Sequence, residues 1–411
     1  MTKQKSTPKA GLILFAGIMF NLSIGVLNAW SVIKAKLTAP PAAGGWAWTS
    51  KQAGLPYSTA IICFALGLLI GGAIQDKIGP RRVVTLGGVL TGGGLILAGL
   101  QGDSVWGMIS GFGLVNGLGI GFGYGCVTPT ALKWFHPSKK GLVSGLIVGG
   151  FSLAAVYFAP LTNTLLSRYG IQNTLILVGA AIIIVSTPCA LSLRNPPANY
   201  LPPAPRQAAY SVETTDFTWR EMLKTKRFYL LFIMFLFPSS VGLMIVGNMA
   251  KIANIQAGVT NTALLALLVS LLSLTNTLGR VLGGLMSDKI GGVNALLVVF
   301  CLQALNMAGF IFYRSLATLI VGIIAAGFSY GTLISVFPSL TAANYGLKNY
   351  GANYGVLFLA WGMAGVVAPL LADFIYDANG NFLLAYVVAA LMMILMIAVN
   401  ILSRTKPPAA Y

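Results

Sequence analysis

The sequence predicts an all-α integral membrane protein with twelve transmembrane helices, arranged as two pseudo-symmetric six-helix bundles. Its composition, the spacing of its apolar stretches and an internal repeat predict this fold class. Only 8% of the 411 residues are charged and 56% are hydrophobic, and the mean hydropathy is +0.82. Soluble domains carry about 25% charged residues, so this chain has too few charges to cover a water-soluble surface. The composition excludes a disordered chain and argues against a soluble enzyme.

Apolar stretches of the length that crosses a bilayer as a helix, about 20 residues, occur twelve times. Between the sixth and seventh lies a polar, proline-rich segment at 194–227. We therefore expect an N-terminal bundle at 1–193, a cytoplasmic linker at 194–227 and a C-terminal bundle at 228–411. The expected spans are 11–33, 55–74, 83–100, 106–132, 141–167 and 172–192, then 228–253, 262–286, 293–313, 317–340, 351–375 and 382–402.

The net charge of +18 is explained by membrane topology. If the N-terminus is cytoplasmic, nineteen of the 26 cations fall in cytoplasmic segments and six in outer loops. The positive-inside rule then places both termini in the cytoplasm, for a multi-pass protein of the cell (inner) membrane. The surplus therefore gives no support for a nucleic-acid partner. The four cysteines lie in apolar stretches without C-x-x-C spacing, so we expect no disulfide, metal site or cofactor.

The two halves of the chain repeat each other. The pattern Gly-x-x-x-Asp-Lys-Ile-Gly at 72–79 recurs at 284–291, Tyr-Gly at 124–125 recurs at 330–331, and Ala-Pro-Leu at 159–161 recurs at 368–370. The three offsets lie between 206 and 212 residues. Such repeats, related by an axis along the membrane normal, are common in secondary transporters, whose substrate sites lie near the bilayer midplane.

The loop Gly-x-x-x-Asp-Lys-x-Gly-x-Arg-Arg after the second span resembles the signature of the major facilitator superfamily. A narrower resemblance begins at Trp134-Phe135, continues through Lys139-Lys140 and ends in glycines at 145, 149 and 150. This stretch is similar to the monocarboxylate transporters and to the bacterial oxalate/formate antiporters. The segment 350–362 resembles the oxalate carriers, except that those carriers have a lysine where this chain has Trp361.

Arg280 is the strongest candidate for a substrate ligand. It lies inside an apolar span, where an uncompensated guanidinium costs at least about 2.5–3.5 kcal/mol. From the 1.5 Å helical rise, the intramembrane acid Asp373 lies roughly 18 Å away in depth and Asp288 about 12 Å away along the helix, so neither can pair with it. An anionic substrate is the natural partner, because the planar fork of arginine suits a carboxylate. Snorkelling to the interface is the structural alternative.

Other candidates follow from the resemblance and from helical spacing. Asn276 lies one turn before Arg280 on the same face, where it could orient the guanidinium, bond a substrate oxygen or simply bond another helix. The hydroxyl of Tyr330 could cap a carboxylate held by Arg280. Trp361 in place of lysine leaves one cation and an apolar wall, which suits a small monocarboxylate rather than a dianion. Further candidates for the cavity wall, or for plain packing, are Tyr124, Phe358, Leu27, Asn28 and Leu146.

The loop signature residues Asp76, Lys77, Arg81 and Asp288 are expected to form a charge lock between neighbouring helices, without substrate contact. Topology-setting charge alone would explain the cations but not the aspartates. The resemblance implies an alternating-access carrier of L-lactate or pyruvate, acting as a monomer. Exchange of small carboxylates in the oxalate/formate manner remains the alternative.

Proton coupling stays open at the level of residues. The monocarboxylate transporters use an Asp in span 8, where this chain has Asn276, and His136 lies in a loop. A coupled H+ would travel with the substrate or on an unidentified group. An intramembrane enzyme would need a nucleophile–base pair or metal ligands at depth, and a channel would need a ring of like charges. The sequence favours neither.

Overall fold

The computed structural model describes residues 8–197, 200, 202 and 216–403, and every regular element in that part of the chain is helical. Eleven of these helices are long and apolar enough to cross a membrane. One of them, α7 (Lys140–Ser192), is divided at Gly170, where φ is 72° and ψ is 179°. Glycine adopts this conformation without steric cost, so the chain turns there and α7 provides two limbs. Counting both limbs, the predicted twelve crossings are confirmed.

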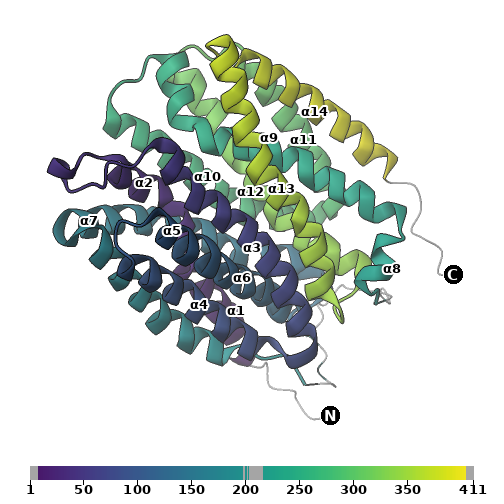
Figure 1. Ribbon diagram of the computed structural model, residues 1–411. Helices are drawn as coiled ribbons and strands as arrows, with labels where there is room; N and C mark the ends of the chain where they lie inside the picture. Colours follow the sequence, from purple (N-terminus) through teal and green to yellow (C-terminus); the bar gives the residue numbers. More distant parts are fainter. Residues whose placement is uncertain (1–7, 198–199, 201, 203–215, 404–411) are drawn as a thin grey trace.

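The first bundle contains α1 to α7 and the second α9 to α14, and each forms one side of the molecule in Figure 1. The first comprises α1 (Pro8–Ser23), α2 (Trp30–Thr38), α3 (Ser50–Ile78), α4 (Pro80–Leu100), α5 (Val105–Met108), α6 (Gly117–Leu132) and α7. The second comprises α9 (Lys226–Ala257), α10 (Thr262–Ile290), α11 (Gly292–Phe310), α12 (Leu316–Tyr345), α13 (Tyr350–Asn379) and α14 (Leu383–Leu402).

The first and fourth crossings are not uniform α-helices. A 3-10 segment, η1 (Gly25–Ala29), separates α1 from α2 within the predicted span 11–33. A Cβ on Gly25 would overlap Ala154 and the carbonyl of Phe151, so glycine lets η1 approach α7 closely. A π-helical segment, η3 (Ile109–Asn116), joins α5 to α6. Hydropathy located both crossings but could not show these changes of helix type.

The connection between the bundles is described in part. Residues 203–215 of the predicted linker lie outside the described residues. Beyond them, the short helix α8 (Trp219–Leu223) begins with a capping box between Thr218 and Glu221. Just before it, the Phe217 amide donates to the carbonyl of Tyr345 (3.1 Å), which attaches this part of the linker to the end of α12.

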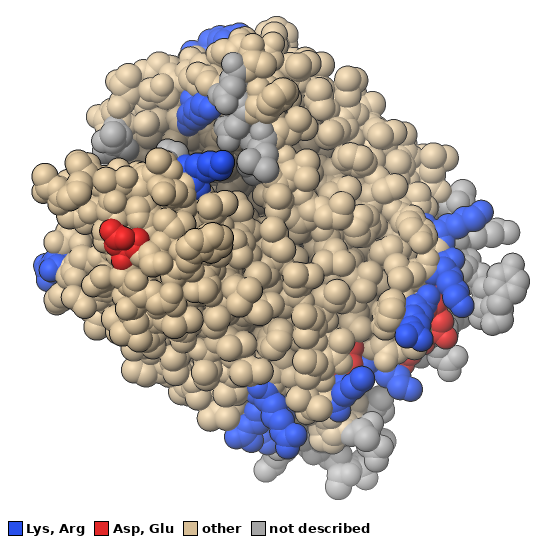
Figure 2. Space-filling view, viewed as in Figure 1, with Lys and Arg blue, Asp and Glu red and all other residues tan. Residues whose placement is uncertain are grey.

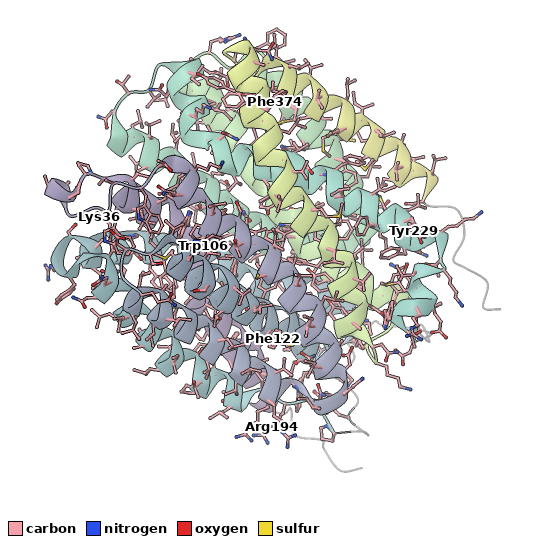
Figure 3. The ribbon with its side chains drawn as sticks, in the orientation of Figure 1. Lys36, Trp106, Phe122, Arg194, Tyr229 and Phe374 are labelled. Atoms are coloured by element: carbon pink, nitrogen blue, oxygen red, sulfur yellow. The ribbon has the colours of Figure 1, made fainter. Side chains whose placement is uncertain are left out.

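The surface divides into an apolar side and charged ends. Figure 2 shows a broad face almost free of charge; some Lys and Arg lie at the upper left of the view, and a larger group lies towards the end where α1 begins and α14 ends. We call this the terminus end. Arg194 lies there, whereas Lys36 lies at the opposite, far end (Figure 3). Large side chains such as Phe374 and Tyr229 are exposed on the outside of the second bundle, as expected for surfaces that face lipid.

Glycines set the packing of α10 against α12, which positions the turn that carries Arg280. A Cβ on Gly331 would overlap the carbonyl of Asn276 and lie 2.9 Å from the amide nitrogen of Arg280. On the opposite side, a Cβ on Gly145 of α7 would overlap the carbonyl of Arg280. The turn from Asn276 to Arg280 is therefore held between two glycines, one from each bundle.

We predict that Gly331→Ala destabilises the protein, because the added methyl group must push α12 away from α10. Overpacking of this kind costs about 1–3 kcal/mol, which should lower the midpoint of thermal unfolding in detergent. Gly93→Ala in α4 is the matched control, since its Cβ would meet no atom within 4 Å, and it should unfold at the wild-type temperature or above. Equal unfolding temperatures for Gly331→Ala and wild type would contradict this account of the packing.

Candidate functional site

The two bundles meet most closely near the terminus end, where two helix pairs cross. There α3 contacts α13 and α7 contacts α10. A Cβ on Gly72 would overlap the backbone of Gly351, and a Cβ on Gly141 would overlap that of Gly284. Backbones this close leave no room for a side chain, so these crossings, which we call the two pinches, close this end of the interface. Figure 2 shows a hollow between the bundles at the far end.

Each pinch is capped by the aspartate predicted from the loop signature. The carboxylate of Asp288 accepts hydrogen bonds from the amides of Gly141 (2.7 Å) and Leu142 (2.8 Å), in the first turn of α7. Asp76 accepts from the amides of Gly351 (3.3 Å) and Ala352 (3.0 Å), in the first turn of α13. Carboxylates are favoured at helix N-termini, where the amides lack partners within the helix. Each bundle thus caps a helix of the other.

The basic residues of the loop signature occupy different surroundings. Lys77 and Arg81 are exposed and are not brought to the pinches. Lys133, which the sequence reasoning did not select, is partly buried at the end of α6 and lies in the field of Asp76 and Asp216. Burial lowers the pKa of Lys133, and these two carboxylates act against that shift. Lys133 lies one residue beyond an apolar stretch, and this position in the sequence does not indicate that it is near Asp76 and Asp216.

Arg280 is buried between the bundles, with 6% of its surface exposed. Its Nε donates to Oδ1 of Asn276 (3.0 Å), one turn earlier on α10. Its NH1 donates to the carbonyl of Val148 on α7 (2.7 Å), across the interface. The predicted orienting role of Asn276 is thus compatible with the geometry. No carboxylate pairs with Arg280 among the side chains that the structure describes, which do not include that of Asp373.

One face of α7 makes three contacts with the second bundle around this arginine. The hydroxyl of Ser144 donates to the carbonyl of Ser335 (2.9 Å), and the hydroxyl of Ser152 bonds with that of Thr277 (2.9 Å). Val148, midway between the two serines, supplies the carbonyl that Arg280 binds. These residues are four apart, so they lie on one face of the helix. Arg280 therefore holds the bundles together as well as offering a cation.

Three other predicted residues lie around the part of the interface that holds Arg280. The ring of Tyr124 on α6 packs against that of Phe151 (5.2 Å between centroids), three residues after Val148, and Tyr330 on α12 precedes Gly331, which meets the backbone of the Asn276–Arg280 turn. The indole Nε1 of Trp361 donates to the hydroxyl of Tyr330 (2.8 Å). This bond leaves the Tyr330 hydroxyl its own proton to donate. The site thus combines one cation with phenolic donors.

Aromatic rings surround these polar groups. Phe64 of α3 contacts four of them, with centroid distances of 5.3 Å to Tyr124, 5.8 Å to Phe151, 5.5 Å to Phe358 and 5.4 Å to Trp361. Phe358 stacks on Trp361 at 4.8 Å. We call these five residues the ring cluster. The sequence reasoning selected Tyr124, Phe358 and Trp361 but missed Phe64 and Phe151, which belong to apolar stretches without any distinguishing motif.

The remaining predicted wall residues lie at the edge of this site. Asn28 in η1 is exposed, and its amide donates to the carbonyls of Gly25 (3.1 Å) and Phe151 (2.9 Å). Leu27 is buried next to it. Leu146 on α7 is partly buried, two residues before Val148. Asn28 is joined to the ring cluster through Phe151, whereas the structure gives Leu146 no specific contact with Arg280.

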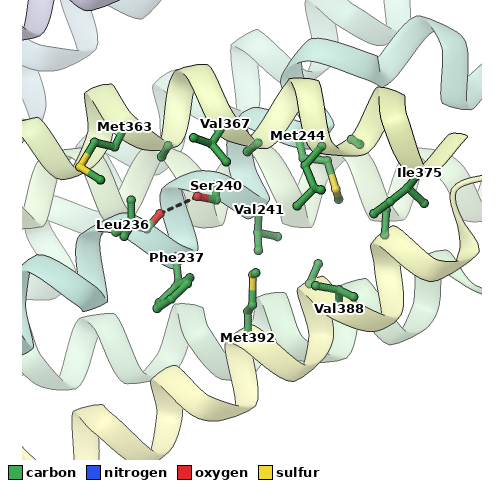
Figure 4. Close-up of a pocket in the computed structure, with 16 residues that line it drawn as sticks. Leu236, Phe237, Ser240, Val241, Met244, Met363, Val367, Ile375, Val388 and Met392 are labelled. Atoms are coloured by element: carbon green, nitrogen blue, oxygen red, sulfur yellow. Dashed lines mark hydrogen bonds between the residues drawn. The ribbon is translucent and has the colours of Figure 1, made fainter. Parts of the chain in front are cut away.

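A cavity away from Arg280 has different chemistry. An apolar groove of about 230 Å³ lies between α9, α13 and α14, lined by residues such as Met363, Val367 and Met392 (Figure 4). Its one hydroxyl, on Ser240, donates to the carbonyl of Leu236 (2.9 Å). The groove contains no charged side chain, so it cannot anchor a carboxylate. Elsewhere in the described residues, no group of three or more His, Cys, Asp and Glu is placed to hold a metal.

The arrangement around Arg280 is suited to binding a small anion. One guanidinium, buried in apolar surroundings, supplies directed donors, and the phenols of Tyr124 and Tyr330 can add two more. The rings limit the space beside them and exclude water, which strengthens any ion pair formed there. In the described part of the chain, with α7 counted as two limbs that meet at Gly170, no other Lys or Arg lies as far from the ends of its helix as Arg280.

Comparison with known proteins agrees with this architecture. The family model described as the Major Facilitator Superfamily matches residues 11–316. The chain is 31% identical over 301 residues to the oxalate:formate antiporter of Oxalobacter formigenes, covering 72% of this chain and 69% of that protein. It is 25% identical over 390 residues to monocarboxylate transporter 13 of Rattus norvegicus, covering 93% and 86%.

A solved structure has the same fold. The chain superposes on the fucose:proton symporter of E. coli with a TM-score of 0.71 and 14% identity, covering 97% of this chain and 98% of that one. At this identity the likeness concerns the fold alone. The family match, the twelve crossings and the two capped bundles together establish that this chain is a member of the major facilitator superfamily, of the group that includes the monocarboxylate transporters and the oxalate:formate antiporter.

Proposed function

We propose that the protein is a secondary active transporter of small monocarboxylates such as L-lactate and pyruvate, working by alternating access and by proton symport. One observation carries the proposal: a single buried guanidinium, bonded to neutral oxygens. One cation balances one carboxylate, whereas a dianion would leave a negative charge in apolar surroundings. Similarity to the monocarboxylate transporters supports the same substrate class.

Substrate binding would act on the contact between the bundles. A carboxylate that takes two donors of Arg280 competes with the carbonyl of Val148, which the guanidinium binds across the interface. Since hydrogen bonds to carboxylates are shorter and stronger than those to neutral carbonyls, the substrate would replace this contact. That exchange would release α7 from α10 near the middle of the membrane and favour movement of the bundles.

The aspartate caps would then decide which side is open. In the structure both pinches are closed at the terminus end, which we assign to the cytoplasm of the cell from the positive-inside rule. This conformation would receive substrate from outside. Opening towards the cytoplasm would require Asp76 and Asp288 to leave the helix N-termini that they cap. Because the whole arrangement lies in one chain, we propose that the monomer is the working unit.

Exchange of small carboxylates is the second candidate, favoured by the 31% identity to the oxalate:formate antiporter. The residue at 361 argues against a dicarboxylate substrate, because the indole offers no positive charge. Proton symport and carboxylate exchange would therefore use the same site at Arg280 and differ in what is coupled to substrate movement, a proton or a second carboxylate.

Loss of the guanidinium should abolish transport while leaving the fold intact. Arg280→Ala removes about two charge-assisted hydrogen bonds to substrate, each worth about 1.5–3 kcal/mol, and should reduce affinity for lactate at least about 100-fold. Saturable uptake into proteoliposomes measures this, with thermal unfolding as the check on folding. Arg168→Ala, an exposed residue far from the site, is the control. Wild-type uptake by Arg280→Ala would exclude the proposed anchor.

Coupling can be measured in the same proteoliposomes. Symport predicts that an inward pH gradient drives accumulation of labelled lactate with no anion inside, and that dissipating the gradient stops it. Exchange predicts uptake only when a carboxylate is enclosed, whatever the pH gradient. Strict dependence on internal anion would therefore replace the symport proposal with the second candidate.

Weakening one cap should open the terminus end. Asp288→Asn keeps one acceptor oxygen and loses the charge. Hydrogen bonds to a charged group are worth about 1.5–3 kcal/mol. The equilibrium between the closed and the open terminus end should therefore shift towards the open form about tenfold or more. Spin labels on cysteines replacing Lys139 and Lys289, exposed on either side of the α7–α10 pinch, report the separation. Asp288→Asn should add a population at longer distance, and Asp103→Asn in an exposed turn should not. Identical distributions for Asp288→Asn and wild type would show that the cap does not hold the pinch.

A further inference from the structure

Phe64 joins aromatic rings of the two bundles and makes two such contacts, whereas Tyr124 makes one, with Phe358. Phe64 lies on α3, in the first bundle, and its ring contacts Phe358 and Trp361 on α13, in the second. It also contacts Tyr124 and Phe151, and Phe151 lies three residues after Val148, whose carbonyl binds Arg280. Only 2% of its surface is exposed. Phe64 is therefore packed on several sides by rings that themselves border the anion site.

The ring cluster lies at one depth in the interface. Phe64 is eight residues from Gly72, and Phe358 is seven residues from Gly351, the two glycines that meet at the α3–α13 pinch. At a rise of 1.5 Å per residue, both rings lie about 10–12 Å from that pinch. The cluster thus forms a layer above the closed end, with the polar groups of Tyr124 and Trp361 in the same layer.

Phe64 can be shortened without removing a polar group from the site. Trp361 donates to the hydroxyl of Tyr330, Tyr124 carries a phenol hydroxyl, and Phe358 is packed against Phe235 and Tyr354 within its own bundle. The ring of Phe64 occupies space without making a hydrogen bond. Shortening it would enlarge the layer and leave every polar partner of Arg280 in place.

We propose that Phe64 sets the upper limit on the chain length of the carboxylate that the site accepts. This rests on the proposed function, because it assumes a carboxylate at Arg280. With the carboxylate fixed there, the alkyl end of the substrate must lie against the ring cluster, and Phe64 contacts more of those rings than any other member. On this proposal the site accepts acids of two to four carbons, and longer chains meet the ring of Phe64.

The test is a series of straight-chain acids from acetate to hexanoate, each measured as an inhibitor of labelled lactate binding to the purified protein. In the wild type, inhibition should weaken beyond about four carbons. In Phe64→Ala, each added methylene that enters the new space should improve binding about fourfold. The ratio of hexanoate to propionate affinity should then rise at least about tenfold over wild type, with Phe64→Leu between the two.

Phe112→Ala is the matched control, because Phe112 is equally buried but packs against Trp30, with a centroid distance of 4.3 Å. It should keep the wild-type order of acids. If Phe64→Ala does not fold, Phe64→Leu provides the same comparison with a smaller expected change. A Phe64 variant that binds lactate but ranks the acids as wild type does would overturn the size limit and leave the proposed function standing. Wild-type protein that binds none of the acids would overturn both.

Discussion

Burying the Arg280 guanidinium costs at least about 2.5–3.5 kcal/mol, and the surrounding structure offsets this cost with neutral partners. Asn276 holds Nε from one turn away, and the Val148 carbonyl holds NH1 from the other bundle. A carboxylate neighbour would neutralise the charge permanently and remove the reason to bind an anion. Neutral oxygens stabilise the cation while leaving its charge available, which is the condition that an anion-binding site requires.

Close packing of the bundles places the Arg280 guanidinium in the interface. Gly145 and Gly331 allow α7 and α12 to approach the backbone around Arg280 from opposite sides. Nearer the terminus end, the glycine pairs let the helices cross, and Asp76 and Asp288 cap the helices that meet there. The repeat in the sequence thus has a physical counterpart, since each half supplies both a capping carboxylate and a capped helix.

Much of this could be predicted from the sequence, because hydropathy, charge placement and helical spacing are local properties. They located the twelve crossings and placed Asn276 on the same helix face as Arg280. Phe64, Phe151, Lys133 and the carbonyl of Val148 could not be identified, because their roles depend on which helix faces another across the bundles. Nothing in their local sequence distinguishes them from residues that pack against their own bundle. The break in the first crossing at η1 was missed for a similar reason, since it depends on the approach of α7 to Gly25.

The most direct test of a single-cation site is equilibrium binding of lactate, pyruvate, formate and oxalate to the purified wild-type protein, measured by calorimetry at one pH and ionic strength. One guanidinium, with an indole rather than a second cation at position 361, predicts that lactate and pyruvate bind, compete with each other and bind more tightly than oxalate. Oxalate binding more tightly than both would contradict it, because a dianion would then find a second positive charge that this site does not contain.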